Sequence, residues 1–537
     1  MVLKKEFIPI LLILLLGTIL RLFKLGAIPP GVTLDEMGYI FNSYSIAQTG
    51  RNVFGEVLPF LTWMVPNGFP FMPVPIYLSA PIYWIFDLSA TSGRLMSSIL
   101  GIIDIFLIYL LVFQVFKNRT FALLSSLFLA ISPWHLHFTR SAYDHNYALF
   151  FYFLGTVLFI YEIRKKRLPI FSVISLLLAV FSYRGMSIIL IPLLILLFWY
   201  GWQVLKATRK QITAFLIGSI VIVLCLFFVS LKYGNAYTAE GKLIFTNPQM
   251  QNYIDGESRE AEGPLWLKRF FLNKPTQILN RLRENYLRGY SPDFLFLYTE
   301  PSQIYSIWSR GRIYFIDLIF IVLGIAFIFS KFKKEALFII ALFLISGLPG
   351  AVGGSPFSAR NFLMSVILPI FTAGGTLFLY NLKLFKKYKN LKYKKLLVIC
   401  IILLYAYSLS SYLFDYYFRY PKIGGEAWGK SFKNLSYKIL ENKEKYEKVI
   451  IGPTTHGDFI QFAFYAKLKP SEVQEIWKNS PKLHSGPFIY KNIHFVPDCL
   501  KKVDRGTLYI TPGQCIKEKP IDIVKDSFGN DIWRFYK

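Results

Sequence analysis

The sequence predicts a polytopic α-helical membrane protein that carries a small soluble α/β domain at its C-terminal end. Hydrophobic residues make up 54% of the 537 residues and aromatic residues 18%, which is more apolar surface than a soluble chain of this length buries. Continuous apolar runs at 7–20, 212–231 and 396–409 approach the roughly 20 residues with which a helix spans a bilayer. Because these runs do not alternate with polar residues, they indicate helices rather than barrel strands.

About eleven segments are predicted to cross the membrane. The first follows Lys4 and Lys5, as the core of a signal peptide would, but Arg21 and Lys24 stand where a cleavage site of small residues is expected. We therefore interpret it as a retained span. The predicted spans lie at 7–23, 95–115, 120–133, 146–163, 169–182, 186–204, 212–231, 313–330, 336–349, 361–380 and 396–414.

The net charge of +28 is distributed in a way that indicates membrane topology rather than nucleic-acid binding. Lysine and arginine cluster in the short segments between apolar runs. If the N-terminus is cytoplasmic and the spans alternate, every such segment falls on the cytoplasmic side, as the positive-inside rule requires. We expect a multi-pass protein of the plasma membrane with no nucleic-acid partner. The basic segments are 117–119, 164–167, 206–210, 331–334 and 383–395.

Three segments then project to the outer side. Outer loops are expected at 24–94 and 232–312, within a transmembrane domain of residues 1–415. The second loop contains a basic and aromatic stretch, 263–290, which suits a helix lying in the membrane interface. The third segment, 416–537, is predicted to be a soluble extracytoplasmic α/β domain.

The C-terminal domain has a readable pattern of elements. Residues 431–448 and 458–468 are predicted to form helices, and 447–453 a strand between them. Two of the four cysteines, Cys499 and Cys515, lie in this domain. In an oxidising compartment they could pair, but their spacing alone does not decide it.

Ionisable residues gather at the outer ends of the predicted spans. Such groups are costly at membrane depth unless they have partners or a function. A mixture of carboxylates, imidazoles and arginines suits a phosphate-bearing substrate with a general base nearby. Four segments far apart in sequence supply the polar and ionisable groups: Asp35 and Glu36; His135, His137, Arg140, Asp144 and His145; Tyr183 and Arg184; and Arg360.

Structural interpretations compete with the functional one. Thr33 with Glu36 three residues later forms a capping-box pattern, in which either carboxylate would only stabilise a helix start. His135 and His137 are two residues apart, so a helix would point them to different faces. Arg140 could anchor at lipid headgroups, as could Arg184, and Asp144 could simply pair with Arg140.

The order of motifs resembles the GT-C membrane glycosyltransferases, in the broad group of bacterial protein O-mannosyltransferases and aminoarabinose transferases. The resemblance covers roughly residues 5–415, and it rests on motifs that follow one another in the right order and on one predicted side. These are PPGVTLDEMGYIFNSYSIAQTGRNVFGEVLPF (29–60), GFPFMPVPIYLSAPIYWIF (68–86), TSGRLMSSILG (91–101), LLSSLFLAISPWHLHFTRSAYDHN (123–146) and SGLPGAVGGSPFSARNFLMSVILP (346–369).

This resemblance implies an enzyme that moves a sugar from a polyprenyl-phosphate donor to a hydroxyl or amine at the outer face, usually with inversion. The acceptor would be a protein, a glycan or a lipid. Asp35 would be the general base and Glu36 the weaker candidate, while Asp144 would support the acceptor or an ion. The substrate-binding group would comprise Arg140, Arg184 and Arg360, on the phosphate, with His135, His137 and Tyr183.

Two features of the sequence qualify the resemblance. The segment GGSPFSAR lacks the histidine that related sequences often carry before the arginine, here Arg360. A divalent metal ion, Mg²⁺ or Mn²⁺, could bind between Asp35 and Asp144, but spacing alone does not decide it. No Walker motif and no glycine-rich nucleotide motif beside a strand is evident, which agrees with a lipid-linked donor.

Three other functions remain alternatives. A transporter or lipid-linked glycan flippase would carry ionisable or broken positions in the middle of its spans, and Asp104 is the one such candidate. A polysaccharide polymerase or ligase shares the substrate class but usually differs in loop order. A non-catalytic scaffold would not need carboxylates and arginines from four segments.

Overall fold

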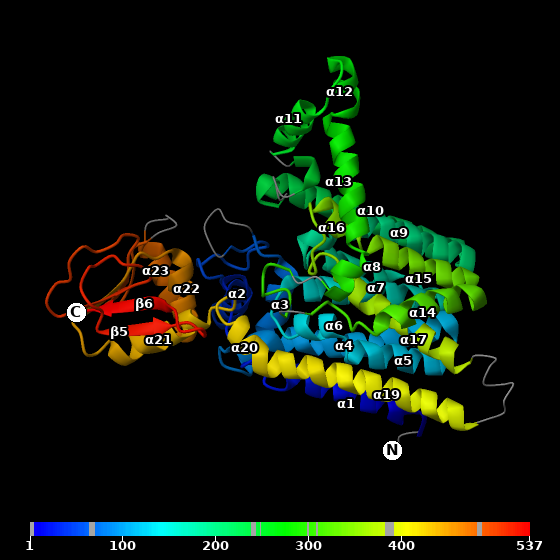
Figure 1. The fold of residues 1–537 in the computed structure, drawn as a ribbon, viewed down its shortest axis with the longest axis horizontal. Helices are drawn as coiled ribbons and strands as arrows, with labels where there is room; N and C mark the ends of the chain where they lie inside the picture. The colour runs from blue at the N-terminus through cyan, green and yellow to red at the C-terminus, as the bar shows by residue number, and fades with distance from the viewer. Residues whose placement is uncertain are drawn as a thin grey trace.

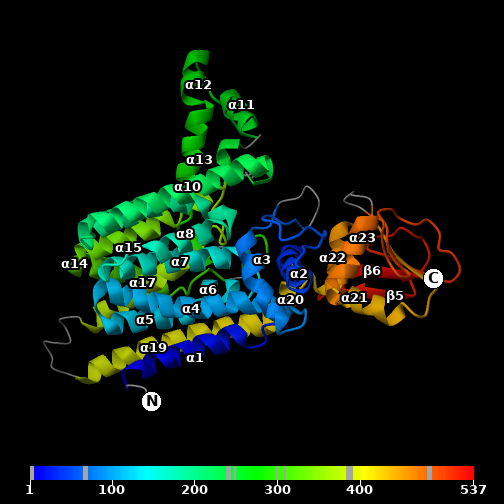
Figure 2. The same ribbon diagram turned by 180° about the vertical axis from the view of Figure 1, so that it is seen from behind.

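The computed structural model in Figures 1 and 2 describes residues 5–63, 70–237, 243–246, 249–297, 300–307, 310–381, 391–480 and 486–537. Part of the predicted basic segment 383–395, residues 383–390, lies outside this description. The molecule has a helical bundle, an outer layer of short helices at one end of it, a C-terminal sheet domain beyond that layer, and a helical arm (Figure 1).

Long apolar helices run side by side in the bundle. Each predicted span overlaps one of them, because hydropathy marks helices that must be apolar on most faces. The bundle helices are α1 (Ile8–Leu22), α4 (Ala90–Phe116), α5 (Arg119–Ala130), α7 (Asp144–Arg164), α8 (Ile170–Val180), α9 (Leu190–Trp199), α10 (Arg209–Tyr237), α14 (Asp317–Lys331), α15 (Lys333–Ile345), α17 (Met364–Tyr380) and α19 (Leu391–Phe414).

Within the described residues, six helical segments are long and apolar enough to cross a membrane by length and composition alone. Shorter apolar helices, among them α1, α5, α8 and α17, complete the bundle. The predicted multi-pass α-helical fold is therefore confirmed. The six segments are Ala90–Phe116, Asp144–Arg164, Arg184–Val204, Arg209–Gly234, Lys333–Val352 and Lys392–Ile423.

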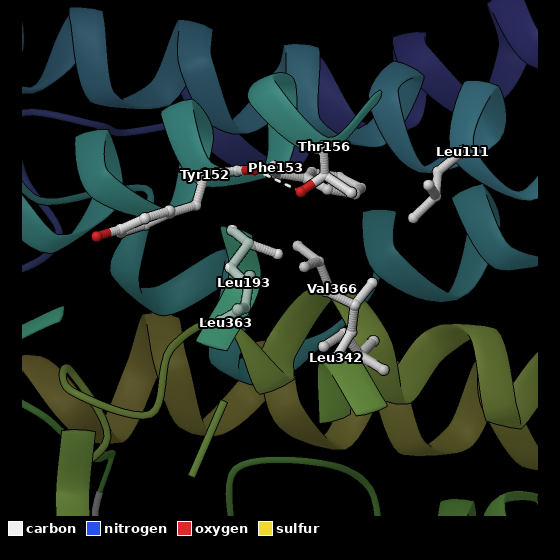
Figure 3. A pocket seen from close by; sticks show the side chains of 9 residues that line it. Leu111, Tyr152, Phe153, Thr156, Leu193, Leu342, Leu363 and Val366 are labelled. Carbon is white, nitrogen blue, oxygen red and sulfur yellow. Dashed lines mark hydrogen bonds between the residues drawn. The ribbon is translucent and has the colours of Figure 1, made fainter. Parts of the chain in front are cut away.

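Small residues let the central helices approach closely. A Cβ added at Gly324 of α14 would lie 1.8 Å from the Phe371 carbonyl oxygen of α17, and one at Gly375 would lie 2.0 Å from that of Phe320. Close backbone packing at small residues helps helices associate in a membrane, where the hydrophobic effect does not drive them together. Elsewhere in the bundle, Leu111, Thr156 and other side chains of α4, α7, α9, α15 and α17 (Figure 3) line a void whose volume is only about 10 Å³.

A layer of short helices covers the end of the bundle opposite the N-terminus (Figure 2). Proline at the first turns of several of these helices fixes the local backbone without losing a helical hydrogen bond. This layer positions the candidate site. It contains α2 (Leu34–Thr49), α3 (Pro73–Ser79), α6 (Pro133–Phe138), the 3₁₀ helix η3 (Arg184–Ile189) and α16 (Leu348–Val352).

The C-terminal domain is α/β, as predicted. Over the described residues its mixed sheet has the order β2-β3-β1-β4-β6-β5, with β1 parallel to both β3 and β4. The predicted strand and the two predicted helices are β1, α21 and α22. The elements are α21 (Lys430–Asn442), β1 (Lys448–Ile451), α22 (His456–Tyr465), α23 (Pro470–Asn479), β2 (Phe488–Tyr490), β3 (Ile493–Phe495), β4 (Thr507–Thr511), β5 (Asp522–Lys525) and β6 (Asp531–Tyr536).

The sheet domain is tied to the first outer segment of the bundle. The Tyr465 hydroxyl accepts a hydrogen bond from the Val32 amide at 3.2 Å, and Gln474 donates to the Ser45 hydroxyl at 3.1 Å and to the Asn52 carbonyl at 3.0 Å. These bonds fix α22 and α23 against α2. Within the domain, Cys499 and Cys515 form a disulfide, which answers the question that their spacing left open.

Candidate active site

A cavity of about 1170 Å³ opens at the covered end of the bundle, beneath α22 of the C-terminal domain. Carboxylates, arginines and tyrosines line one part of it, and apolar side chains of α10 line another. A pocket of this size accommodates a sizeable ligand with both a charged and an apolar portion. The polar lining residues include Asp35, Tyr39, Tyr143, Asp144, His145, Tyr183, Arg184, Ser187, Tyr305, Arg360 and His456.

Asp35 reaches the cavity from the first turn of α2. The Thr33 hydroxyl caps this helix by accepting the Glu36 amide at 3.2 Å, and it also pairs with the Tyr143 hydroxyl at 2.5 Å. The positive end of the helix dipole favours a carboxylate in this turn. Local sequence thus fixes where the helix begins, and the bond to Tyr143 ties that start to the cavity wall.

Asp144 lies on the same cavity from the start of α7. Its Oδ2 accepts a hydrogen bond from the Tyr39 hydroxyl at 2.6 Å, which joins α2 to α7 across 105 residues of sequence. Burial and the neighbouring Asp144 carboxylate raise the pKa of Tyr39 well above its usual value. Tyr39 therefore remains a hydrogen-bond donor that orients Asp144.

Two arginines and a tyrosine face the carboxylates from the other segments. Arg360 is held by a hydrogen bond from Nη1 to the Gly353 carbonyl at 2.6 Å, and its guanidinium carbon lies 5.4 Å from the Phe357 ring centroid. A side chain at Gly353 would collide with this guanidinium. Burial raises the pKa of Tyr183, and the adjacent Arg360 opposes that shift. Arg184, which directly follows Tyr183 in the sequence, also lines the cavity.

The structure brings five of the nine predicted site residues to this cavity and places the other four elsewhere. The five come from all four of the segments singled out in the sequence. Those in the cavity wall are Asp35, Asp144, Tyr183, Arg184 and Arg360. Those outside it, buried among protein partners, are Glu36, Arg140, His135 and His137.

Glu36 belongs to an ion pair behind the cavity wall. Its carboxylate receives two hydrogen bonds from Arg94, at 2.8 and 2.9 Å, and a third from the Ala142 amide at 2.8 Å. Both charged side chains are fully buried. The capping-box pattern is therefore half realised: Thr33 caps the helix, while the Glu36 carboxylate is used by Arg94.

Arg140 closes the end of α1 instead of facing the cavity. Its guanidinium donates to the carbonyls of Leu20, Arg21, Phe23 and Ile28, at 2.8 to 2.9 Å. A helix end leaves such carbonyls without partners, and a buried arginine with several donors satisfies them. The pairing of Arg140 with Asp144 that helical spacing suggested does not form. Arg140 lies in the turn between α6, which ends at Phe138, and α7, which begins at Asp144, so the two residues do not share a helix.

The two histidines of α6 point to different partners, as their spacing predicts. His135 contacts Arg21 at 2.9 Å and Asp104 at 3.3 Å, so the buried Asp104 belongs to a network joining α1, α4 and α6. His137 contacts the Ile304 carbonyl at 2.8 Å and packs against an aromatic cluster with Tyr416, Tyr420 and Trp428.

Further cavity residues were not selected as site residues from the sequence. Tyr39 follows Asp35 by one helical turn, and His145 directly follows Asp144, so position gave a weak signal for both. Nε2 of His145 is buried with no hydrogen-bond partner among the described residues. Burial and the Asp35 carboxylate raise the pKa of Tyr305. His456 comes from the C-terminal domain, where no pattern marked it.

The apolar part of the wall faces outward along α10. Val223 and Phe227 line the cavity and are 41% and 55% exposed. An apolar chain could therefore pass between the cavity and the hydrocarbon region that surrounds the bundle. Within the described residues, no group of three or more His, Cys, Asp or Glu side chains is arranged to hold a metal ion.

The family match covers part of the cavity-forming region. Residues 66–230 match the model of the dolichyl-phosphate-mannose-protein mannosyltransferase family. This stretch contains Asp144, Tyr183 and Arg184, together with the apolar wall of α10. No curated protein matches the chain by sequence.

Solved structures show a similar fold. The oligosaccharyltransferase of Archaeoglobus fulgidus in its apo form has a TM-score of 0.51 and 16% identity, over 86% of this chain and 64% of its own. This chain thus spans less than two thirds of that protein's length. ArnT from Cupriavidus metallidurans bound to undecaprenyl phosphate gives a TM-score of 0.49 and 11% identity, over 98% and 97% of the two chains.

At such identities the first likeness establishes the fold alone, and a TM-score below 0.5 adds nothing to it. With the family match, it confirms the resemblance to GT-C membrane glycosyltransferases. The fold class predicted from the sequence is confirmed as well.

Proposed function

We propose that this protein is a membrane glycosyltransferase that moves a sugar from a polyprenyl-phosphate donor to an acceptor hydroxyl or amine. One observation carries the proposal. Two carboxylates and two arginines from four separated segments line a single cavity, and side chains of α10 form an apolar part of its wall. A donor of this class has the matching parts: an apolar tail, a phosphate and a sugar.

The arginines are suited to the phosphate. Arg184 and Arg360 would bind its oxygens, since a guanidinium stays charged and its planar fork matches two oxygens at once. The apolar side chains of α10 would receive the first part of the prenyl chain. In this arrangement the sugar, at the far side of the phosphate, lies toward Asp35 and Asp144.

The reaction needs one base and one stabilised leaving group. Asp35 would remove the proton of the acceptor as its oxygen or nitrogen attacks the anomeric carbon. The new bond forms to that carbon while its bond to the phosphate oxygen breaks, which inverts its configuration. Negative charge then grows on the departing lipid phosphate, where Arg184 and Arg360 stabilise it.

Asp144 would orient the acceptor through a carboxylate that Tyr39 holds in place. A divalent cation is a further proposal, because Asp35 and Asp144 lie on the same wall and carboxylate oxygens suit Mg²⁺ or Mn²⁺. Dialysis against a chelator tests it: loss of transfer that Mg²⁺ or Mn²⁺ restores would support an ion, and unchanged transfer would reject it.

The acceptor would approach from the side of the C-terminal domain. His456 and Tyr305 line the cavity there, and α22 covers it. A protein, a glycan or a lipid acceptor is compatible with this position. We further propose that this face lies outside the plasma membrane, with the N-terminus in the cytoplasm, as the distribution of basic segments predicts.

Transfer of radiolabelled sugar from a panel of polyprenyl-phosphate sugars tests the proposal, in membranes that contain either wild type or Asp35→Asn. Asparagine keeps the size of the side chain and removes the base, so we expect roughly 10²- to 10⁴-fold slower transfer. Asp87→Asn is the matched control, because Asp87 is exposed at the same end of the molecule and does not line the cavity.

Each outcome has a distinct meaning. Transfer by wild type and by Asp87→Asn that collapses in Asp35→Asn supports both the reaction and the base. Equal transfer by all three removes Asp35 from catalysis. Absence of transfer from every donor in the panel would contradict the proposal and favour a transporter or flippase, for which movement of labelled lipid across vesicles would then be measured.

A further inference from the structure

A helical arm leaves the bundle beside the cavity. It consists of α11 (Met250–Glu260), α12 (Leu265–Phe271) and α13 (Lys274–Arg288), and we refer to these as the arm. Met250 and Ile254 of α11 pack with Ile278 and Leu282 of α13 in a small core of their own. The arm is therefore a folded unit rather than an extended loop.

The base of the arm is fixed to the wall of the cavity. Tyr290, just after α13, donates from its hydroxyl to the Leu344 carbonyl at 2.6 Å and accepts the Gly347 amide at 3.0 Å. Tyr286 donates to the same Leu344 carbonyl at 3.0 Å. Since α16 follows directly and lines the cavity with Pro349 and Val352, the orientation of the arm is set by this attachment.

The arm extends sideways from the bundle. In both ribbon views α13 runs across the long apolar helices rather than along them, and α12 lies at its far end (Figures 1 and 2). The arm leaves from the end of the bundle that carries the C-terminal domain. If the bundle helices cross a bilayer along their length, α13 must lie along the membrane surface on that side.

Large apolar side chains of the arm are left without protein cover. No residue of α12 is buried, and Trp266 and Phe270 are each 69% exposed. On α13, Leu279 and Leu287 are 66% and 61% exposed. Leu287 lies on the side of α13 opposite Ile278, which packs against α11, and Leu279 lies about 100 degrees from Ile278 around the helix. A soluble protein rarely exposes so many large apolar groups together unless something covers them.

Basic residues are interleaved with these apolar groups. Over residues 263–290 the basic side chains are Lys268, Arg269, Lys274, Arg281, Arg283 and Arg288, against one acid, Glu284. The positive charge therefore belongs to α12 and α13, because α11 carries Asp255, Glu257 and Glu260 against Arg259. Some of the basic side chains have protein contacts: Arg281 stacks on Tyr253 and Arg288 pairs with Glu284. The net positive charge beside exposed aromatic and leucine side chains is the composition of a segment that binds an anionic lipid surface.

The apolar surface of the arm continues that of the bundle. Phe227, Phe228 and Leu231, near the outer end of α10, are exposed to the same surroundings as the bundle's other lipid-facing side chains. Leu243, between α10 and the arm, lines the cavity and is partly exposed. Because this band leads from α10 toward the arm, one continuous bilayer would cover both.

We propose that the arm is an anchor that lies in the headgroup region of an anionic membrane leaflet. Trp266 and Phe270 insert below the headgroups, and the basic side chains bind lipid phosphates. The arm then fixes the lateral side of the cavity, between α10 and α16, at the depth of the headgroups. This inference does not rest on the proposed glycosyl transfer.

A fluorophore placed on the arm tests this directly in the full-length protein. In a background of Cys225→Ser and Cys400→Ser, which removes the free cysteines, an environment-sensitive dye is attached at Phe270→Cys. The matched control is Asn252→Cys on α11, because Asn252 is exposed and lies on the side opposite Met250. The protein is reconstituted into phosphatidylcholine vesicles with and without phosphatidylglycerol, with brominated acyl chains as quencher.

We expect the dye at position 270 to emit at shorter wavelength and to be quenched by bromine in vesicles that contain phosphatidylglycerol. The dye at 252 should report water. Charge reversal by Lys268→Glu with Arg269→Glu should reduce the inserted fraction, by roughly fivefold for each charge removed. The two substitutions lie outside the core formed by Met250, Ile254, Ile278 and Leu282. Because Lys268 donates to the Ser258 carbonyl of α11 at 3.1 Å, circular dichroism checks that the helices remain.

Two results would overturn the proposal. One is a dye at 270 that is as accessible to water as the dye at 252 in both kinds of vesicle. The other is protection at 270 that is equal in lipid and in detergent and rises with protein concentration, which would assign this face to a second copy of the chain.

Discussion

Asp35 and Glu36 are neighbours in one helical turn, yet they belong to two different regions of the molecule. Asp35 faces a large cavity beside Asp144. Glu36 lies outside the cavity in a buried seam, where its carboxylate oxygens accept hydrogen bonds from Arg94 and from the Ala142 amide. Consecutive side chains on a helix diverge by about 100 degrees, so one turn serves both regions.

The two regions treat charge in opposite ways. In the seam, Glu36 and Arg94 form an ion pair within the protein. Arg140 likewise donates hydrogen bonds to backbone carbonyls. In the cavity, charged groups from separate segments face a common space. Buried ion pairs hold a structure together, whereas charged groups that line a common space can be reached by a ligand. The comparison therefore separates groups that stabilise the fold from groups that are positioned to act.

The largest expected effect is on stability and tests the seam. Glu36→Gln leaves the buried Arg94 without its counter-charge, which costs about 3–5 kcal/mol of the free energy of unfolding. Asp35→Asn, one residue away, should change it by less than about 0.5 kcal/mol. Thermal unfolding in one detergent measures both. Equal destabilisation by the two substitutions would contradict the division.

Arg360 gives the next largest effect and tests the cavity. Arg360→Gln removes a charged donor, so KM for a lipid-phosphate donor should rise roughly 10- to 100-fold, as for loss of a hydrogen bond to a charged group. Arg360→Lys keeps the positive charge but loses the planar guanidinium, so its KM for the donor should lie between those of wild type and Arg360→Gln. Arg51→Gln, at an exposed position of the same outer layer, should leave KM unchanged. An unaltered KM in Arg360→Gln would remove Arg360 from donor binding.

A substitution at Tyr39 tests whether its hydrogen bond to Asp144, which joins α2 to α7, contributes to the rate of transfer. Tyr39→Phe deletes the hydroxyl that donates to Asp144 and little else. We expect kcat to fall roughly tenfold, the effect of one charge-assisted hydrogen bond, with KM for the donor nearly constant. Steady-state kinetics at saturating donor measure this. A change in donor KM instead would place Tyr39 on the phosphate side.

The smallest expected effect concerns the C-terminal domain. His456→Ala should raise KM for the acceptor about two- to fivefold, since a single neutral hydrogen bond contributes on the order of 1 kcal/mol, and should leave KM for the donor as it was. His494→Ala, in β3 of the same domain and outside the cavity, is the control. A donor effect from His456→Ala would show that the domain covers the lipid side.

Hydropathy and motif order predicted much of this molecule. The spans and the elements of the C-terminal domain follow from local patterns, and the four segments that build the cavity could be found because their ionisable residues interrupt apolar sequence. Which residue of each segment faces the cavity could be found only in part: the resemblance ranked Asp35 above Glu36, but nothing local showed that Arg140, His135 and His137 lie outside the cavity. That Glu36 turns away depends on Arg94, 58 positions later, and no local pattern encodes such a partner.

The remaining differences have the same physical origin. The partners of Arg140 are carbonyl groups, which every residue possesses, so nothing in the sequence marks them as acceptors. His456 reaches the cavity only because α22 packs against α2, a contact between elements more than 400 residues apart. Sequence reasoning identifies which groups need partners, and the fold decides which partners they receive.

The grip of Arg140 on the end of α1 has a consequence for how the protein is made. The carbonyl of Leu20 accepts a hydrogen bond from the guanidinium of Arg140, which is synthesised 120 residues later in the chain. At roughly 5–20 residues per second, that delay is on the order of ten seconds of synthesis. Throughout it, the first helix must keep its exposed carbonyls hydrated at the membrane surface. We expect α1 to remain loosely placed at the translocon until α6 has emerged, so that assembly of the bundle begins with its middle helices and recruits its first one late.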